Sequence, residues 1–313
     1  MNKRLAEFWL KLRWKLYLPE YLYRPSQILT RIRRKTSVHS NYEVAQLPWG
    51  SLLRIRLPEL ISNSIWFKGL FDIVSTETIW RLLDEGDTAL DVGANIGYMT
   101  SLMAARVGKN GRVISFEPHP ELFEELGRNV QLWRDSSEGA TIEVRNSALS
   151  AKGGAAKLVM PPSWRGNRGA GFVSSQSTEV ESENSLEIKL ECLDDIFPDD
   201  RRIELAKFDV EGHEFEAFRG AERLLRLRMI RDIVFEDSMD TESPAKLELK
   251  RHGYTLFSLA KRFRGPKLCG VDRKGASPRD DPNFLATSDP DRAVRRLSRR
   301  GWEVLRRRGS GSD

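Results

Sequence analysis

Cysteine and histidine are scarce in this chain, and long apolar runs are absent. Its 313 residues include two cysteines and four histidines, and neither type shows the paired spacing of a structural zinc site. Without a disulfide framework, a reducing cytoplasm is the expected compartment. No stretch of about 18 uncharged apolar residues occurs, so the sequence predicts no membrane-spanning helix. With 40% hydrophobic and 31% charged residues, the composition excludes a disordered chain and predicts a globular one.

The net charge of +6 is distributed unevenly along the chain. Residues 1–48 carry a net charge of +7 and residues 289–313 carry +4, which leaves −5 for residues 49–288. The basic character therefore belongs to the two ends, and the middle of the chain is mildly acidic.

Residues 1–48 form a basic N-terminal extension. Within residues 1–17 the apolar side chains share one helical face: Leu5, Phe8, Trp9, Leu12 and Leu16. Two interpretations are open: this helix lies against an anionic membrane, at its inner face, or it docks on the protein's own core or on a sister subunit. The sequence does not determine the oligomeric state.

The middle of the chain alternates between two periodicities. Residues 49–75 alternate apolar and polar side chains around Leu53 and Ile55, which predicts a strand pair. From 76 to 288, strands alternate with helices of 10–15 residues, which predicts an α/β fold with a mostly parallel, doubly wound sheet. Residues 150–190 interrupt the alternation and are interpreted as an insertion that forms a substrate loop. Residues 289–313 are interpreted as an Arg-rich tail.

A glycine turn between a strand and a helix is the sharpest feature of the sequence. Residues 91–97 read Asp-Val-Gly-Ala-Asn-Ile-Gly, and Glu117 ends the next strand. Glycines allow the backbone to turn tightly and approach a ligand, and an acid at the end of the second strand can accept both hydroxyls of a ribose. This unit therefore predicts a nucleoside ligand.

The sequence of the turn narrows the choice among nucleoside ligands. Asn95 stands where the dinucleotide fingerprint has its middle glycine, which disfavours NAD and a dehydrogenase. No P-loop sequence occurs, which excludes ATP bound in that way. S-adenosylmethionine carries a ribose and a carboxylate but no phosphate, and it suits this looser turn.

These residues, taken together with a second motif, resemble a known family. Asp91 to Gly97, Phe116-Glu117-Pro118 and the later run Asp209-Val210-Glu211-Gly212-His213-Glu214 look like the FkbM-type methyltransferases. The resemblance covers about residues 70–288 and implies a Rossmann-like class I fold with S-adenosylmethionine as cofactor.

The resemblance also implies roles for individual residues. The cofactor-lining set is Asp91, Gly93, Ala94, Asn95, Gly97, Glu117, Asn146, Ser147 and Ala148. Asp209 closes the fourth core strand beside the sulfonium. An alcohol acceptor needs a positioned base, so we expect Asp209 to orient the reactants and Glu211 or His213 to remove the proton. Negative charge at the first turn of a helix also suits Glu211 without a catalytic role.

The sequence gives weaker indications of the residues that bind the methyl acceptor and of a metal ion. Trp164, Arg165 and Arg168 in the insertion could stack on a sugar ring and bind its polar groups, and Glu236 is a further candidate for substrate binding. This agrees with O-methylation of a saccharide, a lipid or a secondary metabolite, which the resemblance implies. A magnesium ion held by Asp209, Glu236 and Asp237 is a disfavoured alternative.

Two other functions remain open at this point. The arginine-rich ends could clamp nucleic acid, although the acidic middle of the chain and the absence of a base-amination motif argue against it. Alternatively, the fold could be a non-catalytic binding module recruited to a membrane by the basic helix.

Overall fold

The computed structural model describes residues 41–134, 139–174, 184–197, 201–238, 240–272 and 282–306. The predicted helix over residues 1–17 and the basic linker after it lie outside this part of the chain. Within the described residues, no helix combines the length and apolar character needed to cross a bilayer.

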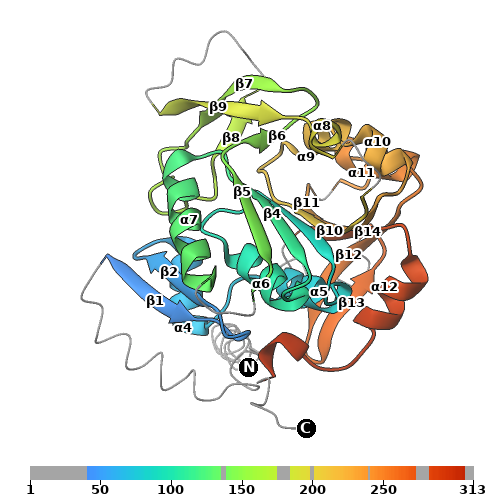
Figure 1. Ribbon diagram of the computed structural model, residues 1–313. Helices are drawn as coiled ribbons and strands as arrows, with labels where there is room; N and C mark the ends of the chain where they lie inside the picture. The colour runs from blue at the N-terminus through green and yellow to red at the C-terminus, as the bar shows by residue number, and fades with distance from the viewer. Residues whose placement is uncertain are drawn as a thin grey trace, which may run out of the picture.

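An eight-stranded sheet forms the centre of the molecule (Figure 1), in the order β13-β12-β14-β11-β10-β3-β4-β5. Its strands are β3 (Thr88–Val92), β4 (Arg112–Phe116), β5 (Thr141–Arg145), β10 (Ile203–Phe208), β11 (Ile230–Glu236), β12 (Thr255–Arg262), β13 (Gly265–Cys269) and β14 (Asn283–Thr287). The pairs from β5 through to β11 are parallel, whereas β14 runs antiparallel to both β11 and β12. This is the predicted doubly wound, mostly parallel sheet, and the Rossmann-like fold class is confirmed.

Helices cover both faces of the sheet because the strand residues are apolar on both sides. One apolar core lies under α5 (Ile73–Leu82), α6 (Tyr98–Val107) and α7 (Pro120–Arg134). The other lies under α8 (Leu193–Ile196), α9 (Glu214–Arg219), α10 (Glu222–Arg226) and α11 (Pro244–Arg251). Neighbouring residues of one strand supply opposite cores, as Ala89 and Leu90 do in β3.

The segment before the sheet differs in part from its prediction. β2 (Leu52–Arg56) is a strand as expected, but it pairs with β1 (Tyr42–Gln46), which precedes the predicted range. The rest of that range contains the helix α4 (Leu60–Lys68). Glu59 caps this helix by accepting from the backbone N–H groups of Ile61 and Ser62, a capping contact that the apolar alternation does not reveal.

The range 150–190, predicted as an insertion that forms a substrate loop, contributes strands to a second sheet, which begins just before it at Ala148. Its four strands are β6 (Ala148–Leu149), β7 (Gly154–Val159), β8 (Phe172–Ser174) and β9 (Ser185–Glu191), in the order β6-β9-β7-β8. Figure 1 shows this sheet beyond the end of the central one, next to α7 and α8. The irregular residues 160–171 connect β7 to β8 and are held at both ends by this pairing.

Residues 289–313 were interpreted as an Arg-rich tail, but the described part of this segment, up to residue 306, is packed into the fold. It contains α12 (Pro290–Leu297) and the short 3-10 helix η1 (Glu303–Leu305), and Trp302 between them is fully buried. The backbone N–H groups of Glu303 and Val304 donate to the buried carboxylate of Glu77 in α5.

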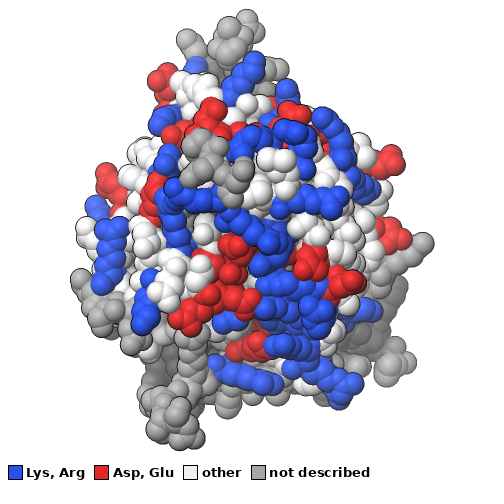
Figure 2. All heavy atoms as spheres, turned by 45° about the vertical axis from the view of Figure 1, so that its right-hand side comes forward, with Lys and Arg blue, Asp and Glu red and all other residues white. Residues whose placement is uncertain are grey.

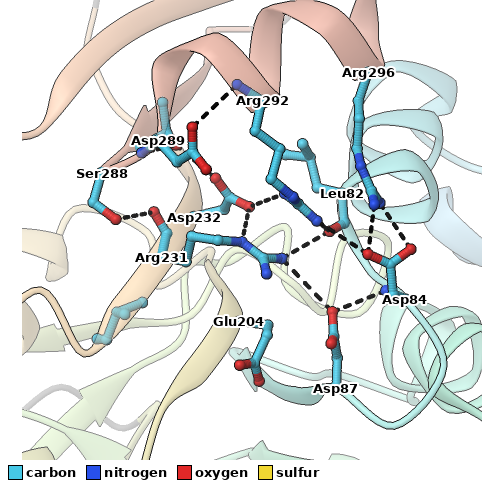
Figure 3. Close-up of polar contacts among 12 residues, drawn as sticks. Leu82, Asp84, Asp87, Glu204, Arg231, Asp232, Ser288, Asp289, Arg292 and Arg296 are labelled. Carbon is cyan, nitrogen blue, oxygen red and sulfur yellow. Dashed lines mark hydrogen bonds and ion pairs between the residues drawn. The ribbon is translucent and has the colours of Figure 1, made fainter.

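Arginines of α12 are bound to acids of the core, as Figure 3 shows. Arg296 forms an ion pair with Asp84 (2.6 Å), and Arg292 forms one with the buried Asp232 (3.1 Å). In Figure 2, which brings this side of the molecule forward, acidic side chains lie between the basic ones. These two arginines are thus internal partners, which removes them from the set that could clamp nucleic acid.

Candidate active site

A cavity of about 450 Å³ opens at the carboxyl ends of the central strands. The chain proceeds outward from β3 to β4 and β5, then returns to place β10 on the other side of β3. Ligands of open α/β sheets bind at such a reversal of strand order, because the loops diverge there and leave a crevice. The fold therefore puts the cavity where the glycine turn and the second acidic motif meet.

The glycine turn forms the floor of the cavity. Gly93, Ala94 and Asn95 line it. Gly93 has a φ of +81°, and a Cβ atom there would overlap the carbonyl oxygen of Asp209. Only glycine permits this close approach of the β3 and β10 loops.

Gly97 has a different place from the one predicted. It does not line the cavity but precedes α6 with a φ of +92°. A Cβ atom there would lie 2.6 Å from Leu126 Cδ1 and 2.9 Å from Trp133 Cη2. This glycine allows α6 to begin against α7, so its contribution to the cavity is indirect.

Asp91 is completely buried at the end of β3. Its Oδ2 accepts a hydrogen bond from Thr100 Oγ1, whereas Oδ1 has no partner among the described residues. Burial raises the pKa of this carboxyl, and the nearby Lys207 opposes that rise. Because an unpaired buried carboxylate oxygen is costly, Asp91 fits a ligand that brings a hydrogen-bond donor into the cavity.

Glu117 is held by the backbone on both sides. Its Oε2 accepts from the N–H of Asn95 (2.8 Å) and its Oε1 from the N–H of His119 (2.9 Å). Each oxygen keeps a second lone pair, so the carboxylate can still accept two ribose hydroxyls. Burial raises the pKa of Glu117 to about 7, despite these two N–H donors. Donors from a ligand would stabilise its ionised form.

The segment after β5 supports this acid from behind. Asn146 does not line the cavity; its Nδ2 donates to the carbonyls of Glu117 (2.8 Å) and Pro118 (3.1 Å). Ser147 and Ala148 line the cavity. Asn146 therefore fixes the turn that carries Glu117.

The end of β10 carries a buried ion pair that the sequence analysis missed. Lys207 Nζ lies 2.9 Å from Asp209 Oδ2, and Lys207 is directly opposite Asp91 on the neighbouring strand. Burial alone would lower the pKa of Lys207, but Asp209 and Asp91 outweigh it and the pKa is raised. The signal was a lysine inside the apolar run of residues 205–208, because a buried cation requires acidic partners.

The turn after Asp209 presents two candidate bases. Glu211 lines the cavity with a φ of +53°, and partial burial, together with Asp209, raises its pKa. His213 also lines the cavity, and its Nε2 lies 3.1 Å from Ser150 Oγ. Burial lowers the pKa of His213, which keeps the imidazole neutral near pH 7. Glu214 supports the turn from below, where its Oε1 accepts from the N–H of Val210.

The loop between β7 and β8 covers the cavity in a way that differs from the prediction. Trp164 lines the cavity and stacks on His119, with ring centroids 4.5 Å apart. Arg168 is buried and forms a bidentate pair with Glu125 (2.8 and 2.6 Å). Arg165 is exposed and does not line the cavity. Of the three, Trp164 and Arg168 line the cavity, and Nη1 and Nη2 of Arg168 are already bound by Glu125.

Glu236 lines the cavity, but the carboxylates proposed for magnesium do not gather around one point. Asp237 is instead paired with Lys246 Nζ (2.9 Å), and Asp209 is paired with Lys207. Across the described ranges no group of three His, Cys, Asp or Glu side chains is arranged to hold a metal ion. Asp72 and Asn283, which come from distant parts of the chain, also line the cavity and were not predicted.

Comparison with known proteins identifies the family. The family model described as Methyltransferase FkbM domain matches residues 91–256, more than half of the 313 residues. A second, described as Protein-L-isoaspartate(D-aspartate) O-methyltransferase, matches residues 26–147. The second match contains the glycine turn and Glu117 but ends before β10 and the acidic turn.

Individual relatives agree with the first match. Hexuronic acid methyltransferase AglP of Haloferax volcanii is 27% identical over 190 residues, which cover 55% of this chain and 72% of that protein. Methyltransferase sdnD of Sordaria araneosa is 28% identical over 172 residues, which cover 47% of this chain and 64% of that protein. The solved structure of a methyltransferase FkbM from Methylobacillus flagellatus KT is 16% identical with a TM-score of 0.40, covering 73% of this chain and about half (48%) of its own. The chain belongs to the FkbM family of S-adenosylmethionine-dependent methyltransferases.

Proposed function

We propose that this enzyme methylates a hydroxyl group of a saccharide or of a small hydroxylated metabolite. The observation that carries the proposal is that one cavity contains both the ribose-type acid Glu117 and the acidic turn 209–213. The relatives of this chain include AglP, named as a hexuronic acid methyltransferase, and sdnD, named as a methyltransferase.

The residues of the glycine turn and of β4 would hold the cofactor. Glu117 accepts the two ribose hydroxyls, Asp91 accepts a donor from the amino acid portion, and Ser147 and Ala148 lie at the adenine side. When bound, S-adenosylmethionine supplies an electrophilic methyl group on a sulfonium. The acidic lining of the cavity favours this positive charge, because opposite charges attract strongly where water is excluded.

Asp209 and its neighbours would perform the acceptor half of the reaction. The acceptor oxygen forms a bond to the methyl carbon while the carbon–sulfur bond breaks, and the electron pair stays on sulfur. Lys207 fixes Asp209 by the 2.9 Å ion pair, so that Asp209 orients the acceptor hydroxyl. The hydroxyl proton passes to Glu211, whose raised pKa makes it a stronger base than an ordinary glutamate. His213, neutral near pH 7, is the alternative base.

Methyl transfer from radiolabelled S-adenosylmethionine to a panel of glycosides and hydroxylated metabolites tests the proposal. We expect an alkali-stable methyl ether as product. An alkali-labile methyl ester would indicate carboxyl methylation, and label on nitrogen would indicate an amine acceptor; both outcomes contradict it.

Three variants separate the roles within the turn. Asp209→Asn and Glu211→Gln should lower turnover about 10²-fold or more, while cofactor affinity measured by calorimetry stays within a few-fold of wild type. His213→Gln should have the large effect only if His213, not Glu211, is the base. Glu222→Gln, at the start of α10 and outside the cavity lining, is the matched control and should retain full activity. Full activity of Asp209→Asn would refute the orienting role.

The role of residues 1–17 at a membrane stays a prediction, because those residues lie outside the described part of the chain.

A further inference from the structure

The second sheet supplies an apolar wall to the cavity. Its strand β6 begins three residues after β5 ends and pairs with β9, which in turn pairs with β7. Ala148 and Leu149 of β6 line the cavity. Leu158 of β7 and Val173 of β8 are cross-strand partners, and both line it as well. This wall therefore stands beyond β4 and β5, on the side of the cavity away from Asp209.

The loop from β7 to β8 lies over the turn that carries Glu117. Trp164 stacks on His119, with ring centroids 4.5 Å apart, and the N–H of His119 donates to Glu117 Oε1. A Cβ atom on Gly169 would lie 3.6 Å from Asn95 Nδ2, and the N–H of Asn95 donates to Glu117 Oε2. The loop thus contacts both residues whose backbone holds the carboxylate proposed to bind the ribose.

Two anchors fix the loop in this position. The N–H of Leu60, at the start of α4, donates to the carbonyl of Gly166 (3.0 Å). Farther along the loop, Arg168 binds Glu125 of α7 through Nη1 and Nη2 (2.8 and 2.6 Å). The loop is therefore tied to α4 and to α7, the helix that follows β4 in the chain.

Arg168 retains a donor that the protein does not use. Its side chain is 4% exposed and lines the cavity, and its Nε is buried without a hydrogen-bond partner among the described residues. Burial raises the pKa of Glu117, and the Arg168 guanidinium is close enough to oppose that rise. A buried unpaired donor is costly, so this N–H fits a ligand that places an acceptor atom at the Glu117 end of the cavity.

The chemistry of this end of the cavity suits a nucleoside. The base of adenosine has broad apolar faces, which pack well against aliphatic and aromatic side chains such as Leu158, Val173 and Trp164. Its ring nitrogens and the oxygens of its ribose are hydrogen-bond acceptors, which match the N–H of Arg168. The carboxylate of Glu117 accepts from the ribose hydroxyls beside them.

We infer that the second sheet and its β7–β8 loop form the adenosine pocket of the cofactor site: Leu158 and Val173 pack against the base, Trp164 covers it, and Arg168 Nε donates to the nucleoside. Trp164 and Arg168 then serve the cofactor, in place of the acceptor to which their sequence pattern pointed. This inference rests on the cofactor part of the proposed function and deepens it.

Two nucleoside probes test the inference by calorimetry on the full chain. S-adenosylhomocysteine carries the whole cofactor skeleton, whereas 5′-methylthioadenosine keeps the adenosine but lacks the amino acid portion. Trp164→Leu removes the aromatic cover, and Arg168→Lys keeps a cation for Glu125 but removes Nε. Each variant should weaken the binding of both probes by a similar factor of about fivefold or more, because one contact of this kind is lost. Asp91→Asn, in the glycine turn, should instead weaken S-adenosylhomocysteine much more than 5′-methylthioadenosine.

Matched controls carry the same substitutions at exposed positions. Phe172→Leu changes an aromatic residue of β8 that is 44% exposed and outside the cavity lining. Arg128→Lys changes an exposed arginine of α7 that is paired with Glu124. Both controls should bind the two probes as the wild type does. Wild-type affinity for both probes in Trp164→Leu and Arg168→Lys, or a loss confined to S-adenosylhomocysteine, would overturn the inference.

A measurement on the wild-type chain covers the case in which a variant fails to fold. With labelled methyl groups, the adenine protons of bound S-adenosylhomocysteine should show nuclear Overhauser contacts with the methyl groups of Leu158 or Val173. Contacts with the Ala148 methyl group but with neither of these two side chains would overturn the inference.

The two proposals fail in different ways. A methyl ester or a methylated amine as product would overturn the proposed hydroxyl acceptor, whereas the affinities of the two nucleoside probes would still assign the pocket. Wild-type probe affinities in both loop variants would overturn the pocket, whereas formation of a methyl ether would still support the proposed function.

Discussion

The titration of Glu117 should control how tightly the enzyme holds its cofactor. Ribose hydroxyls donate to the ionised carboxylate, whereas burial raises the pKa of Glu117 to about 7 in the unliganded protein. Below pH 7 the carboxyl is protonated, and cofactor binding must then release that proton. The dissociation constant should therefore rise as pH falls, by about 30-fold at pH 5.5 and approaching tenfold per pH unit below that. Above pH 8 this dependence should disappear.

Replacing Glu117 with glutamine tests the same reasoning at fixed pH. The amide nitrogen of glutamine would face one of the two backbone N–H groups that now donate to the carboxylate, and it cannot accept a ribose hydroxyl. A hydrogen bond to a charged group contributes about 1.5–3 kcal/mol. The variant loses one of the two ribose hydrogen bonds and the charge behind the other, which predicts an affinity lower by about 10-fold or more at pH 8. The variant should also lack the pH dependence of the wild type.

Isothermal calorimetry of S-adenosylhomocysteine from pH 5.5 to 8.5 is the measurement. Glu124→Gln is the control. This substitution removes the same charge, but from an exposed position on α7, where 67% of the Glu124 side chain is accessible. A wild-type affinity that does not change between pH 5.5 and 8 would refute the proposed ionisation of Glu117. Wild-type affinity in Glu117→Gln would refute its contact with the ribose.

Three further predictions concern the fold around the site, and urea unfolding measures each of them. Gly97→Ala should lower the free energy of unfolding more than Gly86→Ala does. Both glycines have a positive φ, but only a Cβ atom at Gly97 would contact other side chains, and such overpacking costs about 1–3 kcal/mol. Equal losses of stability in the two variants would refute this prediction. Glu125→Ala should destabilise the protein by about 3–5 kcal/mol, because the buried Arg168 loses its bidentate partner and keeps only the half-exposed Glu121 at 3.4 Å. A loss below about 1 kcal/mol would show that the pair is not buried in solution. Trp302→Ala should cost about 3–5 kcal/mol, since Trp302 is fully buried, and an unchanged stability would mean that the C-terminal segment is not part of the folded core.

The residues proposed to hold the cofactor could be selected from the sequence because they lie close together along the chain. Asp91, Gly93 and Asn95 lie within five residues, and Glu117 follows one helix later. A strand, a turn and a helix fix the relative positions of such residues before any distant contact forms. Asn146 and Gly97 show the limit of this reasoning, because both lie in segments that border the cavity but do not line it. Packing decides that Asn146 contacts the turn after β4 and that Gly97 faces α7.

The rest of the cavity lining was harder to predict from the sequence because it is assembled from distant segments. Asp72 and Asn283 are 211 positions apart and meet only because β14 inserts between β11 and β12. Arg168 was predicted to bind substrate from its place beside Trp164, but Glu125 of α7 takes both ends of its guanidinium. The pattern of apolar and polar residues along one segment does not show which other segment will pack against it.

The sequence by itself determined the features that depend on neighbouring residues. The alternation of strands and helices predicts a doubly wound sheet, and the glycine turn 91–97 together with Glu117 predicts a nucleoside ligand. It also located the basic charge at the two ends. Tertiary structure decided where that charge goes, since Arg292 and Arg296 pair with acids from β11 and from the loop after α5. The tertiary structure also decided which polar side chains line the cavity and which form ion pairs or hydrogen bonds within the protein. Burial makes an unpaired charge costly, so a side chain's role is set by the partner that the fold brings to it.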